Sequence, residues 1–219
     1  LAGGEYAYRR QVNAVQRRIK ILKRKIEALK RRKEDYILKK IEEGGKIVVI
    51  SGYYNAGKTS LFNALTGMNK PVSPRPFTTL SSKYAGLFGG RIYLVDTIGF
   101  VLDLDPSLIE SFQLNLLDIS YSSLILLVVD SSDSPELARL KLEEAMRILE
   151  RLGKRRDEML LVLNKIDLID EGRLSDLRTV LHDFLSEIPW VEVSAKTGVG
   201  LDSLVEEMRT LLEEKTAGS

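Results

Sequence analysis

The stretch that most constrains the fold of this chain is GYYNAGKTS, at residues 52–60. It fits the pattern G-x-x-x-x-G-K-[ST] and lies between an apolar run, KIVVIS at 46–51, and a predicted helix from Lys58 to Thr66. Between a strand and a helix, such a loop wraps backbone N–H groups around phosphate oxygens at the positive end of the helix. A glycine-rich turn that arose by chance is the alternative, and the strand–helix setting argues against it. The sequence therefore predicts a phosphate-binding loop.

Beyond this loop, apolar runs alternate with helical segments. Further strands are predicted at 91–96, 123–130, 159–164 and 190–193, and further helices at 107–119, 135–152, 173–187 and 201–214. Alternation of this kind, with nearly continuous apolar strands, is typical of a mostly parallel sheet with helices on both faces. We therefore expect one α/β domain over residues 45–215, followed by a short tail at 216–219.

Residues 1–44 predict a long helix in front of that domain. No glycine or proline interrupts the chain from Glu5 to Glu43. Apolar residues recur there at alternating spacings of three and four, which is a heptad pattern: Val12, Val15, Ile19, Leu22, Ile26 and Leu29. The pattern falters at Lys33, so a bend or fraying is expected near residues 31–35, and the glycine pair at 44–45 ends the helix.

The same helix is strongly basic. Residues 9–40 contain fourteen lysines and arginines and three acids, a net charge of +11 (14 − 3), whereas the whole chain carries only +2. A nucleic-acid contact and a solvated face are both consistent with this charge. The apolar stripe must also be covered, either by a hairpin partner or by a preceding region of a longer protein.

Composition excludes several classes of protein. The chain has no cysteine, so it has no disulfide and no thiolate metal site. No apolar run approaches the roughly 18 residues that cross a bilayer, and the opening LAGGEY has neither a methionine nor a signal-peptide pattern. We expect a cytoplasmic, monomeric protein and a fragment of a longer one.

A metal site is predicted beside the phosphate loop. Asp96 ends the apolar run RIYLVD and is followed at the third position by Gly99. Because the carboxyl ends of parallel strands meet at one edge of the sheet, Thr59 and Asp96 are the expected Mg²⁺ ligands, Asp96 directly or through water. Lys58 would reach the outer phosphates. The nucleotide contacts expected in the loop are Gly52, Asn55, Ala56, Gly57, Lys58, Thr59 and Ser60.

The segment PVSPRPFTTLSS, at 71–82, predicts a loop because it is rich in proline, serine and threonine. Phe77, Thr78 and Thr79 are its candidate nucleotide contacts. Thr78 and Thr79 could fold over the terminal phosphate, and Thr79 could give Mg²⁺ a further hydroxyl. Threonine-rich loops are common, so this assignment depends on the neighbouring motifs.

A purine-recognition site is predicted where the later strands end. NKID, at 164–167, follows the strand MLLVL, and the Asp167 carboxylate can accept two hydrogen bonds from the ring N–H and amine of guanine. Adenine has no such pair of donors. Asn164 would brace the loops and the Lys165 stem would lie along the base. SAK follows the strand WVEV, where Ser194, Ala195 and Lys196 would complete the site, Ala195 N–H meeting the guanine carbonyl.

In this order, GYYNAGKTS, FTTL, DTIG, NKID and SAK resemble the five motifs of the translation-factor-related GTPases. The stretch DTIGFVLDLDPSLIESF and the basic helix before the domain are similar to the HflX family, although Tyr54 stands where threonine is usual and Thr59 where serine is usual. The resemblance implies a P-loop GTPase fold and Mg²⁺-dependent hydrolysis of GTP to GDP. It also implies binding to the large ribosomal subunit and its RNA, in subunit splitting or rescue, and a missing N-terminal domain.

Phe100 raises a question about hydrolysis. In Ras-like GTPases the residue after DxxG is a glutamine that orients the attacking water, which a phenylalanine cannot do. HflX-like proteins resemble other GTPases with a hydrophobic residue here, and Phe100 is expected to pack rather than react. Intrinsic turnover should then be slow, with Lys58, Thr79 and Gly99 as the remaining catalytic candidates. In related potassium-activated GTPases an asparagine at the position of Asn55 helps to hold K⁺.

Two alternatives stay open. One is a GTPase similar to the Obg, Era or tRNA-modification GTPases, with another RNA partner. The other is a regulatory module that binds nucleotide and has negligible turnover. The stretch after Gly99 favours the HflX resemblance over the first, and phosphate release would separate the second.

Overall fold

The computed structural model describes residues 2–68, 83–97, 99–100 and 113–217. Its centre is a six-stranded sheet with the strand order β2-β3-β1-β4-β5-β6. The strands are β1 Lys46–Gly52, β2 Lys83–Leu87, β3 Ile92–Asp96, β4 Leu124–Asp130, β5 Met159–Asn164 and β6 Trp190–Val193. All neighbours pair in parallel except β2, which runs antiparallel to β3 at the edge. The predicted α/β fold with a mostly parallel sheet is confirmed.

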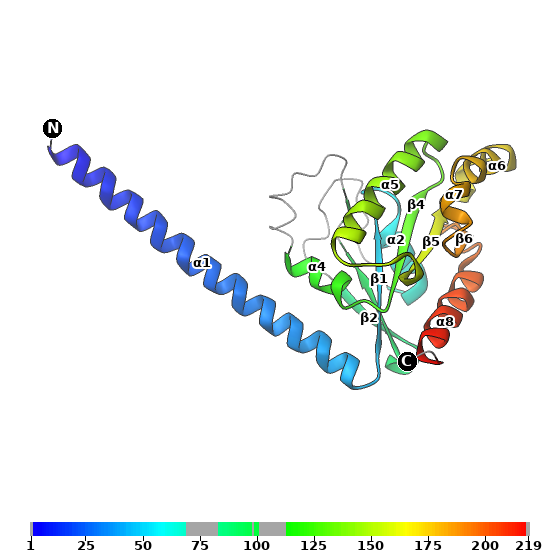
Figure 1. Cartoon of the computed structure of the whole chain (residues 1–219), viewed down its shortest axis with the longest axis horizontal. Helices are drawn as coiled ribbons and strands as arrows, with labels where there is room; N and C mark the ends of the chain where they lie inside the picture. Colours follow the sequence, from blue (N-terminus) through cyan, green and yellow to red (C-terminus); the bar gives the residue numbers. More distant parts are fainter. Residues whose placement is uncertain (1, 69–82, 98, 101–112, 218–219) are drawn as a thin grey trace.

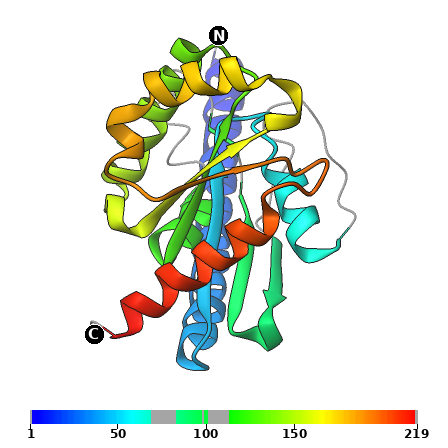
Figure 2. The same cartoon turned by 90° about the vertical axis from the view of Figure 1, so that its right-hand side faces the viewer.

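The sheet is covered on both faces, as expected. In the described part of the chain its helices are α2 Lys58–Thr66, α4 Gln113–Ser120, α5 Pro135–Arg151, α6 Glu171–Val180, α7 His182–Leu185 and α8 Leu201–Ala217. Alternate residues of β4 point to opposite faces: Ile125 and Leu127 join the core under α4 to α7, whereas Leu124 and Leu126 join the core under α2 and α8. Figure 2 shows α8 in front of the sheet and α1 behind it.

Two sequence predictions need correction, and a third is described only in part. The strand β2 was not predicted, because KYAGL has no continuous apolar run and its edge position leaves Gly86 exposed. The predicted helix at 173–187 is two helices, α6 and α7, which separate at Leu181, and α6 begins earlier because Asp170 caps it by accepting from Arg173 N–H. Of the predicted helix at 107–119, residues 107–112 lie outside the described residues.

The helix α1, Ala2–Glu42, is continuous, so the fraying expected at 31–35 is absent. Most of it extends away from the sheet, and only its last third packs on the domain (Figure 1). Val15 and Leu29 of the predicted apolar stripe are accordingly more than half exposed, whereas Ile37, beyond the interruption at Lys33, is fully buried. Among the described helices, none has both the length and the apolar character needed to cross a membrane.

Lys33 interrupts the apolar stripe because it faces a buried carboxylate. Lys33 Nζ lies 2.6 Å from Asp118 Oδ2 on α4, and Tyr84 on β2 donates its hydroxyl to Asp118 Oδ1. Asp118 is fully buried, and burial raises the pKa of the Tyr84 hydroxyl, which therefore stays a donor. A buried carboxylate is tolerated when it is paired in this way. The Lys33–Asp118–Tyr84 cluster thus joins α1, α4 and β2.

Candidate nucleotide-binding site

The phosphate loop leaves β1 at Gly52 and enters α2 at Lys58. Gly52 and Gly57 have φ angles of 134° and 94°, which side chains rarely adopt. A Cβ on Gly52 would lie 2.4 Å from Val128 O, and one on Gly57 would lie 2.2 Å from Asn164 Nδ2. Both glycines of the motif are therefore required by the close approach of β4 and β5.

Lys58 folds back over its own loop. Its side chain is buried, with 7% exposure, and Nζ donates to Tyr53 O at 2.5 Å. Burial lowers the pKa of Lys58 to about 8; nearby Asp96 opposes this effect and Lys165 adds to it. A desolvated cation inside a loop of backbone N–H groups is suited to an anionic ligand.

The two predicted metal ligands lie next to each other. Asp96, at the carboxyl end of β3, is buried, and its Oδ2 accepts from Thr59 Oγ1 at 3.2 Å. Thr59 lies in the first turn of α2, which follows β1, and β1 is the neighbour of β3, with Ile50 in register with Asp96. A hydroxyl and a carboxylate in contact offer the hard oxygen ligands that Mg²⁺ prefers. The third candidate, Thr79, lies outside the described residues, as do Phe77 and Thr78.

Phe100 packs against the phosphate loop, as expected. Its N–H donates to Gly52 O at 3.0 Å, and its carbonyl accepts from Tyr54 N–H at 2.8 Å. Its ring is nearly buried and meets the Tyr53 ring edge-on, with centroids 6.4 Å apart. Gly99 is so close to the loop that a Cβ there would lie 2.7 Å from Lys58 Nζ. Phe100 therefore anchors the segment after DxxG to the loop.

Asn164 connects the two ends of the site. Its Nδ2 donates to Ala56 O in the phosphate loop at 2.9 Å, and its Oδ1 accepts from Ala195 N–H at 3.0 Å. The side chain is buried at the end of β5. One amide thereby fixes the distance between the phosphate loop and the SAK segment.

Asp167 lies on a short 3₁₀ turn, Ile166–Leu168, and is exposed to solvent. Its Oδ1 accepts from Ser194 Oγ at 2.6 Å, and that hydroxyl in turn accepts from Thr197 N–H at 3.1 Å. The carboxylate is therefore oriented by the SAK segment and still open to a ligand. Lys196 is exposed, and Ser60 is half-buried on α2.

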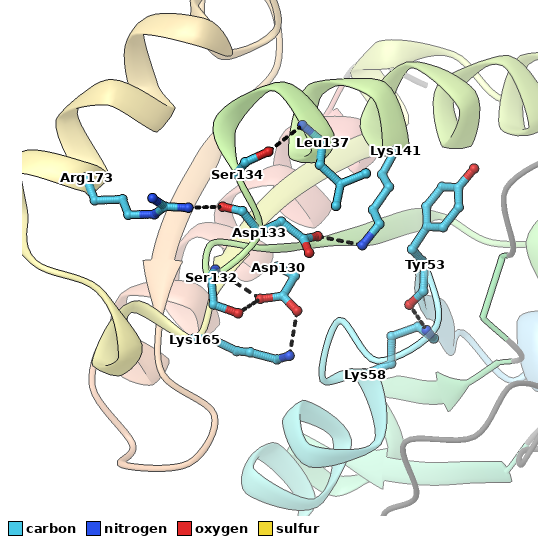
Figure 3. Close-up of polar contacts among 10 residues, drawn as sticks. All are labelled: Tyr53, Lys58, Asp130, Ser132, Asp133, Ser134, Leu137, Lys141, Lys165 and Arg173. Atoms are coloured by element: carbon cyan, nitrogen blue, oxygen red, sulfur yellow. Dashed lines mark hydrogen bonds and ion pairs between the residues drawn. The ribbon is translucent and has the colours of Figure 1, made fainter.

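The structure also adds Asp130 to the site, a residue that the motifs did not indicate. Lys165 Nζ lies 2.5 Å from Oδ2 of Asp130, which ends β4 (Figure 3). The sequence did carry a signal, because Asp130 closes the apolar run SLILLVVD just as Asp96 closes RIYLVD. A carboxylate at the carboxyl end of a buried parallel strand is a candidate site residue wherever it occurs.

A phosphate loop, a Thr–Asp pair and a base-recognition turn along one edge of a mostly parallel sheet are features of a P-loop GTPase domain. The family model described as 50S ribosome-binding GTPase matches residues 47–165. A GTPase HflX from Thermofilum pendens is 35% identical over 221 residues, covering 100% of this chain and 52% of that protein. The chain belongs to the HflX family, and it spans about half the length of the curated relatives it matches.

Solved structures agree with this assignment. The crystal structure of SsGBP in complex with GDP is 28% identical, with a TM-score of 0.62, and covers 78% of this chain and 50% of that one. NFeoB from S. thermophilus bound to GDP·AlF₄⁻ and K⁺ is 25% identical, with a TM-score of 0.55, and covers 74% of this chain and 60% of that one. The predicted family is thereby confirmed.

Proposed function

We propose that this chain binds GTP with Mg²⁺ and hydrolyses it to GDP and phosphate. The observation that carries the proposal is the position of Asn164, whose side chain bonds Ala56 in the phosphate loop and Ala195 in the SAK segment. These two segments would hold opposite ends of one nucleotide. Asp167, oriented by Ser194, would select guanine through two hydrogen bonds.

The phosphate end would work through charge. Lys58 would leave the Tyr53 carbonyl and meet the outer phosphates, where Gly99 N–H is a further candidate donor. Thr59 and Asp96, with Thr79 as the predicted third ligand, would hold Mg²⁺. When bound, the ion would neutralise the negative charge that grows on the phosphate oxygens during transfer.

Turnover without an activator is expected to be slow, because Phe100 has no polar group to orient water and is held in the core. A monovalent cation would supply part of the missing charge. Asn55, exposed on the phosphate loop with φ 62°, is the residue that we propose would help to hold K⁺. The K⁺ in the NFeoB structure supports this proposal.

Single-turnover phosphate release from GTP and from ATP, each in KCl and in NaCl, tests these proposals together. We expect release from GTP only, and faster in KCl. Equal release from GTP and ATP would contradict the assignment of the base-recognition site. Binding of GTP without release would favour the regulatory module, and equal rates in the two salts would remove the role of Asn55.

For the partner we propose the large ribosomal subunit and its RNA, in subunit splitting or rescue. The support is that the matching family is one of 50S ribosome-binding GTPases, together with the +11 charge of residues 9–40, most of which project from the domain. The chain should co-sediment with large subunits more strongly with a GTP analogue than with GDP. Equal binding to small subunits or to unrelated RNA would favour the Obg- or Era-like alternative.

The organisation follows from the same proposal. Residues 1–44 would link the GTPase domain, 45–215, to a further N-terminal region, and 216–219 would be a tail. The exposed stripe of α1 would be covered in the longer protein, whose relatives are about twice this length. A cytoplasmic monomer is consistent with this arrangement, and size-exclusion chromatography of the full-length protein would check it.

A further inference from the structure

Asp130 holds the base-recognition lysine through a carboxylate that is itself fixed. Asp130 is 8% exposed, and its Oδ1 accepts from the N–H of Ser132 at 3.0 Å and from the Ser132 hydroxyl at 2.6 Å. The other oxygen, Oδ2, faces Lys165 Nζ at 2.5 Å (Figure 3). Both oxygens are therefore occupied, and the carboxylate has a single orientation.

The route of Lys165 places it across the phosphate loop. Lys165 directly follows Asn164, the last residue of β5, and has a φ angle of 68°, so the chain changes direction there and does not continue the strand. A Cβ on Gly57 would lie 4.0 Å from Lys165 Cε, so the end of the stem passes beside the second motif glycine. The backbone of Lys165 belongs to the base-recognition turn, whereas its ammonium ends at β4.

We propose that Asp130 is a positioning residue for guanine nucleotides: it fixes the Lys165 stem beside the phosphate loop before the ligand arrives. This inference rests on the proposed function. A free lysine side chain occupies many rotamers and loses that freedom when a base is laid along it. Because Asp130 already restricts the lysine in the free protein, less conformational entropy is lost on binding. Removing Asp130 should therefore weaken nucleotide affinity and leave the chemical step unchanged.

A neighbouring pair provides a matched control. Asp133 lies three residues further along the same loop, and its Oδ2 accepts from Lys141 Nζ at 2.6 Å. Lys141 is on α5, away from the base-recognition turn. The substitutions Asp130→Asn and Asp133→Asn therefore remove one carboxylate–lysine pair each, from the same loop. Asparagine keeps a carbonyl oxygen, so Asp130→Asn leaves an acceptor for Ser132.

The experiment measures the affinity for fluorescent GDP and the KM and kcat for GTP in the intact chain. We expect Asp130→Asn to raise Kd and KM about tenfold while kcat changes less than about twofold. Asp133→Asn should match the wild type in Kd, KM and kcat. In a Lys165→Ala background, Asp130→Asn should cause no further loss, because the residue acts only through that lysine.

Several outcomes would overturn the inference. Equal affinities of Asp130→Asn and Asp133→Asn, or an additive loss in the Lys165→Ala background, would each remove it while leaving guanine selectivity intact. If Asp130→Asn lowers the melting temperature well below that of the control, Lys165→Met breaks the same pair from the other side, and an unchanged affinity there would also overturn it. A wild-type chain that binds GDP and ADP equally would remove the proposed function and the inference with it.

Discussion

Replacing Lys58 with methionine should stabilise the nucleotide-free fold while it strongly weakens nucleotide binding. The Lys58 ammonium is buried, and its pKa of about 8 lies below the 10.5 of a free lysine. At pH 7 this difference corresponds to about 3 kcal/mol of unfavourable free energy in the folded state, which methionine removes. Urea unfolding of the two proteins at pH 7 measures this gain.

The gain should depend on pH in a defined direction. Because the folded pKa of Lys58 is lower than the unfolded one, the unfolded chain binds more protons between pH 8 and 10.5. The free energy of unfolding of the wild type should therefore rise relative to that of Lys58→Met across that window. The advantage of Lys58→Met should be at its maximum below pH 8 and should vanish near pH 10.5. A pH-independent difference would show that the burial of this charge is not its cause.

The same substitution that stabilises the fold should weaken the binding of GTP. Without the ammonium, GTP affinity is expected to fall by about 100-fold or more, since charge-assisted contacts to phosphate are among the strongest polar contacts. For the wild type, affinity should fall about tenfold per pH unit above 8, as the free protein loses the proton. Lys154→Met is the control: Lys154 is equally buried but pairs with Glu158 at 3.2 Å, so its loss should destabilise the fold and leave GTP affinity unchanged.

The second large effect is expected at Asp167. Asp167→Asn replaces an acceptor of two hydrogen bonds with a side chain that carries one acceptor and one donor group. GTP affinity should fall about 100-fold, whereas xanthosine triphosphate, which has a carbonyl where guanine has its amine, should bind better than GTP. Competition against fluorescent GDP measures both affinities.

Asp170→Asn is a suitable control for Asp167→Asn. Asp170 lies three residues away and caps α6 by accepting from Arg173 N–H at 2.9 Å. Asparagine also caps helices, so this variant should retain both fold and guanine preference. If Asp167→Asn still prefers GTP to xanthosine triphosphate, the carboxylate does not read the base, and the NKID assignment is wrong.

The sequence predicted those features that depend on neighbouring residues. Each motif is a short run between a strand and a helix, so its place at one edge of the sheet follows from the alternation of elements. Features that depend on distant partners escaped it. Lys33 looked like a defect in a helical stripe, because its partner Asp118 is 85 residues away. Asp130 closes an apolar run as Asp96 does, but nothing beside it in the chain indicates its partner Lys165.

The strand β2 and the break between α6 and α7 were missed for a different reason. An edge strand is half exposed and needs no apolar run, so KYAGL resembles a loop in sequence. The break at Leu181 lies inside a segment whose apolar residues keep a helical spacing, and Leu181 itself is fully buried. Packing, rather than local preference, decides where such a helix ends.

The cluster of Lys33, Asp118 and Tyr84 lies where the long helix α1 is attached to the domain. From Ile37, where α1 is anchored in the core, to Ala2 the helix is about 50 Å long at 1.5 Å per residue. A tilt of about 5° at that anchor would displace the far tip by about 4 to 5 Å, more than the length of a hydrogen bond. Small tilts of α1 that leave the sheet undisturbed would thus become displacements of several ångströms at its N-terminal end, large enough to make or break contacts with a partner bound there.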